Sequence, residues 1–147
     1  MIFMIAAVTF LIDRITKSIA VNNLFLGQSS KVIPGIFHLT LVLNRGTAFG
    51  LFKGWTAFFI LLSVVVIAGI VIYVFRNKGM DILLSWALGL ILGGALGNLF
   101  DRLRFGCVID FFDFRIWPIF NVADSCLTIG VLILIFKIFT ERKKKEA

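Results

Sequence analysis

The sequence is poor in the residues on which many enzyme sites and small extracellular folds depend. Its 147 residues include one histidine, two cysteines and two prolines. No H-E-x-x-H or G-x-S-x-G motif is present, so zinc peptidases and serine hydrolases of those types are not supported. His38 lies in an alternating stretch and is expected to be structural or to face solvent. Because Cys126 falls among apolar residues and Cys107 is the only other cysteine, we expect neither a disulfide nor a metal site.

Charged residues are also scarce, at 16% of the chain, whereas hydrophobic residues make up 60% and the mean hydropathy is +1.04. A soluble domain of this length cannot bury so much apolar surface, so lipid must cover the excess. Long charge-free runs suit helices that face acyl chains better than the alternating strands of a membrane barrel. The sequence therefore predicts an all-α membrane protein with one domain over residues 1–147.

Four transmembrane helices are expected, at about 1–20, 55–75, 82–100 and 122–139, followed by a basic tail at 140–147 that we expect to be disordered. The second and third contain no charged residue, and each approaches the roughly 20 residues that cross a bilayer. The first is interrupted by Asp13, Arg14 and Lys17. It has no basic start and no small-residue cleavage site, so it is expected to remain in the mature protein. Alternating residues within 21–54 predict a small β-rich surface segment between helices 1 and 2.

Four spans place both termini on one side of the membrane. The net charge of +7 includes the basic tail directly after an apolar run, which is typical of a cytoplasmic anchor rather than of a nucleic-acid partner. The two sides carry similar numbers of basic residues, seven with the termini and eight opposite, so the orientation rests mainly on the tail. We expect both termini in the cytoplasm and the β-rich segment outside it.

The polar residues that interrupt the apolar pattern are expected near one surface of the membrane, on the side opposite the termini. They are Asp13, Lys17, Asn44, Asn98, Asp101, Arg102, Asp110, Asn121 and Asp124. Polar groups at membrane depth are costly and usually functional. Asp13 and Lys17 are four residues apart, so they share a helix face and can form an ion pair, either as a helix-end clamp or as part of a site. Asn121, three residues before Asp124, is also typical of a helix N-terminal cap, which alone would explain both residues.

Small residues mark one face of the third predicted helix. Gly89, Gly93 and Gly97 repeat every four residues, with Gly94 beside them, and such a face allows another helix to approach closely in lipid. The pattern predicts helix packing.

Two aspartates suffice for peptide hydrolysis, because one carboxylate can deprotonate water while a protonated partner polarises the scissile carbonyl. Asp124, near a helix N-terminus, is favoured as the anion, whereas Asp110 among phenylalanines resists ionisation. Asp101 is the main competitor, but its neighbour Arg102 is expected to hold it in an ion pair. Asp113 is a weaker competitor.

Five ordered segments resemble the motifs of the lipoprotein signal peptidases, the signal peptidase II family. They read Asp13-Arg-Ile-Thr-Lys17, Asn44-Arg-Gly-Thr-Ala-Phe49, Gly93-Gly-Ala-Leu-Gly-Asn98-Leu-Phe-Asp101-Arg102, Val108-Ile-Asp110-Phe111 and Phe120-Asn-Val-Ala-Asp124-Ser125. The resemblance covers nearly the whole chain and implies that Asp110 and Asp124 are the catalytic pair. The substrate-binding or supporting residues that it implies are Asp13, Lys17, Asn44, Gly46, Asn98, Asp101, Arg102, Asn121 and Ala123.

The family resemblance also implies an activity. It predicts a monomeric endopeptidase of the bacterial inner membrane that removes the signal peptide from diacylglyceryl-modified prolipoproteins, cleaving on the amino side of the lipidated cysteine. The active site would face away from the cytoplasm, in contact with membrane lipid and without a metal or cofactor. One departure is the short interval between Asp110 and Asp124, which predicts a tight turn at Pro118.

Two other functions fit parts of the pattern. A small four-helix subunit of an ion or proton-coupled transporter could use Asp13, Lys17 and Asp124 as a relay. A scaffold could use its glycine face to join a larger assembly. The enzyme is favoured because the carboxylates cluster toward one face and do not form a continuous path through the membrane.

Overall fold

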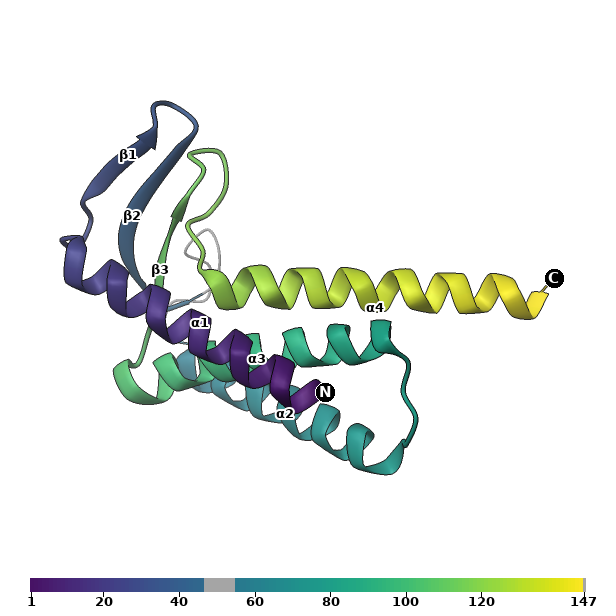
Figure 1. Cartoon of the computed structure of the whole chain (residues 1–147). Coiled ribbons are helices and arrows are strands. Elements are labelled where there is room, and N and C mark those ends of the chain that lie inside the picture. Colours follow the sequence, from purple (N-terminus) through teal and green to yellow (C-terminus); the bar gives the residue numbers. More distant parts are fainter. Residues whose placement is uncertain (47–54, 147) are drawn as a thin grey trace.

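The computed structural model describes residues 1–46 and 55–146, and within them Figure 1 shows four helices beside a small sheet. The elements are α1 (Ile2–Asn23), β1 (Ser29–Ile33), β2 (Phe37–Asn44), α2 (Thr56–Arg76), α3 (Ile82–Phe105), β3 (Val108–Asp113) and α4 (Val122–Glu146). The helices begin where hydropathy predicted them. The Thr47–Phe49 part of the second motif, and the end of the predicted 21–54 segment, lie outside the described residues.

Helix α3 is the centre of the helical part, with α1, α2 and α4 all packed against it. Its glycines make this possible. A Cβ atom added at Gly89 or Gly93 would lie 2.7 Å from Ile5 or 2.6 Å from Thr9 of α1, and one added at Gly94 would lie 2.5 Å from a backbone oxygen of α4. The predicted glycine-mediated packing is confirmed.

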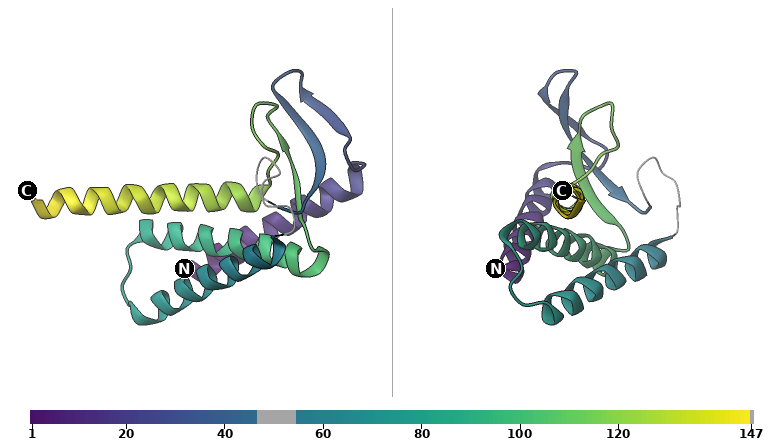
Figure 2. Two further views of the ribbon diagram at one scale, coloured as in Figure 1. Left: turned by 180° about the vertical axis from the view of Figure 1, so that it is seen from behind. Right: turned by 90° about the vertical axis from the view of Figure 1, so that its right-hand side faces the viewer.

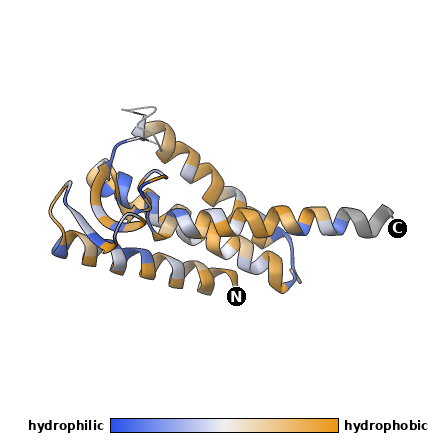
Figure 3. Cartoon of the chain, turned by 90° about the horizontal axis from the view of Figure 1, so that it is seen from above, coloured by the Kyte–Doolittle hydropathy of each residue, from blue (hydrophilic) through white to orange (hydrophobic). Residues whose placement is uncertain are grey.

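Three helical segments are long and apolar enough to cross a membrane: Thr56–Arg76, Ile82–Phe105 and Val122–Glu141. Apolar residues predominate along the helices in Figure 3. The predicted disordered tail at 140–147 is wrong, because α4 stays helical to Glu146. An ion pair between Lys137 and Glu141, four residues apart, and a run of good helix formers support this extension.

The sheet stands at one end of the helices (Figures 1 and 2) and has the antiparallel order β1-β2-β3. Its first two strands confirm the predicted β-rich segment. Strand β3 was not predicted. It comes from the connection between the third and fourth helices, where valine, isoleucine and phenylalanine favour a strand.

The chain between β3 and α4 returns along its own strand. Phe120 pairs with Phe112, and Phe120 N donates to the Phe112 carbonyl at 3.1 Å. The bend lies at 115–117, where Arg115 has a φ of 67°, so the turn predicted at Pro118 falls earlier than expected. This return brings the start of α4 beside β3.

Candidate active site

Asp110 and Asp124 reach one cavity from different elements. Asp110 lies in the middle of β3, opposite Val42 of β2, and its side chain is 1% exposed. Asp124 lies in the first turn of α4. Both line a cavity of about 320 Å³. The other residues around it are Asn44, Gly46, Arg102, Val108, Trp117, Pro118, Ile119 and Phe120.

Two asparagine amides hold the carboxyl group of Asp110. Asn44 Nδ2 donates to Oδ2 at 2.9 Å, and Asn121 Nδ2 donates to Oδ1 at 2.6 Å. Asn44 is the last residue of β2, so the pairing of β2 with β3 brings it to Asp110. The backbone N–H of Gly46 donates to Asn44 Oδ1 at 3.0 Å and fixes which way that amide points.

The carboxyl group of Asp124 is held in a similar way. Asn98 Nδ2 of α3 donates to Oδ1 at 2.7 Å, and the backbone N–H of Asn121 donates to Oδ2 at 3.3 Å. In return, Asp124 N donates to Asn121 Oδ1 at 2.9 Å, which confirms the predicted N-terminal cap. Asn121 therefore caps α4 and also contacts both aspartates.

The environment of Asp110 favours its protonated form. Burial raises its pKa, and the nearby negative charge of Asp124 adds to this, which together bring the pKa from 3.8 to about 7 despite the hydrogen bonds from Asn44 and Asn121. Near neutral pH the two sites can therefore hold one proton between them. Asp113 on the same strand behaves differently, because hydrogen bonds from Thr40 and Arg115 outweigh its burial and lower its pKa.

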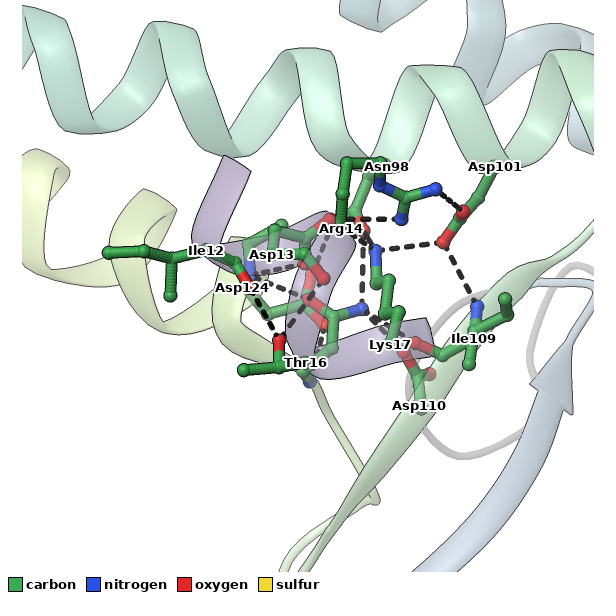
Figure 4. A network of polar contacts seen from close by, with 12 residues as sticks. Ile12, Asp13, Arg14, Thr16, Lys17, Asn98, Asp101, Ile109, Asp110 and Asp124 are labelled. Atoms are coloured by element: carbon green, nitrogen blue, oxygen red, sulfur yellow. Dashed lines mark hydrogen bonds and ion pairs between the residues drawn. The ribbon is translucent and has the colours of Figure 1, made fainter. Parts of the chain in front are cut away.

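A buried cluster of charges lies beside the two aspartates (Figure 4). Lys17 Nζ is 2.9 Å from Asp13, 2.8 Å from Asp101 and 3.1 Å from Asn98 Oδ1. The two carboxylates are fully buried, and Lys17 is 1% exposed. The predicted pairing of Asp13 with Lys17 is confirmed. It belongs to a larger network that joins α1 to α3.

Arg14 completes this network and was not recognised from the sequence. Its guanidinium lies 2.6 Å from Asp101 and 3.0 Å from Asp13. The cluster therefore consists of two cations and two carboxylates and is neutral, its members being Asp13, Arg14, Lys17 and Asp101. The prediction that Arg102 pairs with Asp101 is therefore wrong. Arg14 and Lys17 of α1 occupy the Asp101 carboxylate, whereas the Arg102 guanidinium lies over Phe59 of α2.

The network is also tied to the elements that carry the aspartates. Ala123 N of α4 donates to Asp13 Oδ1 at 3.1 Å, and Ile109 N of β3 donates to Asp101 Oδ2 at 3.2 Å. In each bond the donating residue directly precedes an aspartate of the cavity in the sequence. The cluster thus fixes the backbones that position Asp110 and Asp124.

Arg102 lies on the cavity side of α3. Its guanidinium lies 5.2 Å from the ring centre of Phe59 of α2 and interacts electrostatically with Asp110 and Asp124, without forming an ion pair with either among the described residues. Its N–H groups are therefore available to the cavity. Within residues 1–46 and 55–146, no group of three His, Cys, Asp or Glu side chains could hold a metal ion.

Comparison with known proteins identifies a family. The chain matches the family model for signal peptidase (SPase) II over residues 5–140. It is 42% identical to the lipoprotein signal peptidase of Halothermothrix orenii, covering 97% of this chain and 98% of that protein, and 45% identical to that of Desulfitobacterium hafniense, covering 99% and 98%. A solved bacterial membrane enzyme superposes with a TM-score of 0.91 at 33% identity, covering 98% of this chain and 90% of that one.

Proposed function

The chain belongs to the signal peptidase II family of aspartic peptidases, and on this premise we propose that Asp110 and Asp124 carry out the cleavage of prolipoproteins. The observation that supports the pair is their arrangement. The two carboxyl groups share one cavity, share Asn121 as a hydrogen-bond partner, and interact strongly enough for Asp124 to raise the pKa of Asp110.

In the proposed reaction Asp110 holds the shared proton and Asp124 is the base. Asp124 removes a proton from water, whose oxygen attacks the scissile carbonyl carbon, while the acid form of Asp110 donates a hydrogen bond to the carbonyl oxygen. The tetrahedral intermediate collapses when the C–N bond breaks, and the departing amine takes a proton from Asp124. The products are the signal peptide, with a new carboxyl group, and a lipoprotein that begins with the diacylglyceryl cysteine.

The remaining site residues have supporting roles in this proposal. Asn44, Asn98 and Asn121 orient the two carboxyl groups, and Arg102 offers N–H donors to the substrate backbone. The charge cluster around Lys17 holds α1 against α3.

We also propose that all four helices span the membrane, as one domain over residues 1–147. Helix α1 is interrupted by charged residues, yet these side chains turn inward, with Asp13 and Lys17 buried. The large hydrophobic residues of α1 that are exposed are Phe3, Met4, Val8, Leu11, Ile12, Ile15, Ile19 and Val21. At about 1.5 Å per residue its 22 residues reach roughly 33 Å, enough for a bilayer core of about 30 Å.

With four spans both termini lie on one side of the membrane, and the basic tail favours the cytoplasm for that side. In this proposal the aspartates lie at the outer face of the bacterial inner membrane, where a monomer acts without a nucleic-acid partner. An apolar cavity of about 500 Å³, lined by Phe114, Phe120 and Ile129, adjoins Asp124. Such a surface allows the diacylglyceryl group and the signal helix to stay in hydrocarbon while the scissile bond meets the aspartates.

The test is cleavage of a diacylglyceryl-modified prolipoprotein by purified protein in detergent without added metal. Asp110→Asn and Asp124→Asn should each lose turnover while remaining folded. Asp113→Asn is the matched control, since this aspartate lies on the same strand but is paired with Arg115 at 3.0 Å. If either of the first two variants keeps turnover near that of the control, the catalytic pair is assigned wrongly.

A further inference from the structure

A second cavity lies at the opposite end of the helices from the aspartates. Its volume is about 590 Å³, and it shares no lining residue with the cavity of Asp110 and Asp124. It begins at Asp81, the N-cap of α3, which lies about 30 Å along the helix from Asp101 at about 1.5 Å per residue. That separation is about the thickness of the hydrocarbon core, so the cavity lies at the other membrane surface.

The inner part of this cavity is an apolar trough between α2 and α4, floored by α3. Ile70, Leu84, Leu88 and Leu134 line it. Gly69 leaves it open, because a Cβ atom built there would meet nothing within 4 Å. We call this part the α2–α4 trough.

The rim of the trough is polar and carries two ammonium groups and two carboxylates. Lys137 pairs with both Asp81, at 2.5 Å, and Glu141, so this group of three side chains has a net charge of −1. Lys78 also lines the cavity and is exposed, and it has neither a hydrogen bond nor an ion pair with any residue that the structure describes. Asn77 Nδ2 is already bonded to the Tyr73 carbonyl at 2.8 Å. The ammonium of Lys78 is therefore the cation of the rim that is open to a ligand.

We propose that the α2–α4 trough binds a phospholipid of the adjacent leaflet, with one acyl chain against Ile70 and Leu134 and its phosphate at Lys78. An apolar floor that ends at an unpaired ammonium group, at the depth where head groups lie, matches the chemistry of an acyl chain that carries a phosphate. A second protein helix fits less well, because it would have to bury the charges of Asp81, Lys137 and Glu141 away from water.

Native mass spectrometry of the detergent-purified protein with added phosphatidylglycerol tests the proposal without using the peptidase activity. The wild type should retain one lipid molecule. Lys78→Ala should weaken binding about fivefold, since a basic residue near a membrane surface contributes about 1 kcal/mol toward anionic lipid. Lys31→Ala is the matched control, because Lys31 is an exposed lysine on β1, at the other end of the molecule.

A second pair of variants tests the acyl-chain part of the trough. Gly69→Leu should prevent retention of the lipid by filling the trough, whereas Ala68→Leu adds the same side chain at an exposed neighbour that does not line the cavity. Free space at Gly69 makes the first variant compatible with folding, which circular dichroism checks.

Three outcomes would overturn the proposal. Equal lipid retention by Lys78→Ala and Lys31→Ala would exclude a role for the free cation, whatever the effect of Gly69→Leu. Equal affinity for glycerol phosphate and for the intact lipid would make this an anion site without an acyl chain. A dimer that Gly69→Leu disrupts would show that a second copy of the chain occupies the trough.

Discussion

Replacing Lys17 by methionine tests the proposal that the buried charge cluster holds α1 in place. Methionine keeps an unbranched apolar chain of similar length, so the change mainly removes the ammonium group that lies within 3 Å of both Asp13 and Asp101. The cluster then changes from neutral to a net charge of −1, with Arg14 alone facing two fully buried carboxylates.

Removing one partner of a buried ion pair costs about 3–5 kcal/mol, because it leaves an uncompensated charge out of water. We therefore expect Lys17→Met to lower the free energy of unfolding by that amount. Adding Asp101→Asn to it restores neutrality. The double variant should be at least about 1 kcal/mol more stable than Lys17→Met alone, although each single change destabilises the wild type.

The free energies can be compared by reversible unfolding in mixed micelles of mild detergent and dodecyl sulfate, followed by circular dichroism. Lys31→Met is the control, because this exposed lysine should tolerate the change within about 0.5 kcal/mol. If the double variant is no more stable than Lys17→Met, the net charge of the cluster does not explain the cost, and charge balance is not what holds α1 in place.

Three further outcomes follow from the site. Because the pKa of Asp110 is raised to about 7, the pair loses its shared proton as the pH rises through that value, so kcat/KM should fall above about pH 7; a flat profile to pH 9 would contradict this. Phe59→Leu removes the ring that supports Arg102, so it should lower kcat/KM about tenfold and shift the alkaline limb of the pH profile to higher pH. Phe75→Leu, at an exposed phenylalanine near the other end of α2, should change neither. Gly94→Ala places a methyl group 2.5 Å from a carbonyl oxygen of α4 and should lower the free energy of unfolding by about 1–3 kcal/mol, measured as for Lys17→Met.

Local spacing was sufficient to predict the helices and the contacts within them. Hydropathy located the helix starts, and the four-residue interval from Asp13 to Lys17 gave an ion pair that the structure confirms. The interval from Asn121 to Asp124 gave the cap of α4. These contacts depend only on the geometry of a single helix turn, which is the same in every protein.

Contacts between distant segments could not be predicted in this way. Lys17 bonds to Asn98, 81 positions away, and only the packing of α1 on α3 brings them together. The error over Arg102 has the same origin. The packing of α1 on α3 brings Arg14 and Lys17 to Asp101, while Arg102 lies over Phe59 of α2.

Strand β3 was missed because its sequence carries two conflicting signals. Val108–Asp113 has the β-branched and aromatic residues of a strand, but two aspartates interrupt the run, and we interpreted the segment as a connection. The pairing of β3 with β2 places Asp110 opposite Val42 and lets Asn44 reach it. The sheet is therefore part of the site, which a view limited to the membrane helices does not reveal.

The three asparagines of the site share one arrangement that bears on the shared proton. Each amide oxygen accepts a hydrogen bond, from the N–H of Gly46 at Asn44, from Lys17 at Asn98 and from the N–H of Asp124 at Asn121. With the oxygen held in this way, each NH₂ group must point the other way, toward a carboxyl group.

The carboxyl oxygens of Asp110 and Asp124 consequently all accept hydrogen bonds from fixed donors, at Asn44, Asn98 and Asn121. None of these groups can accept a hydrogen bond from a protonated aspartate, because each presents an N–H to the carboxyl group and an N–H only donates. In the proposed mechanism the proton on Asp110 therefore points away from the asparagines, toward Asp124 or into the cavity. That is the direction from which a scissile carbonyl and its attacking water would approach.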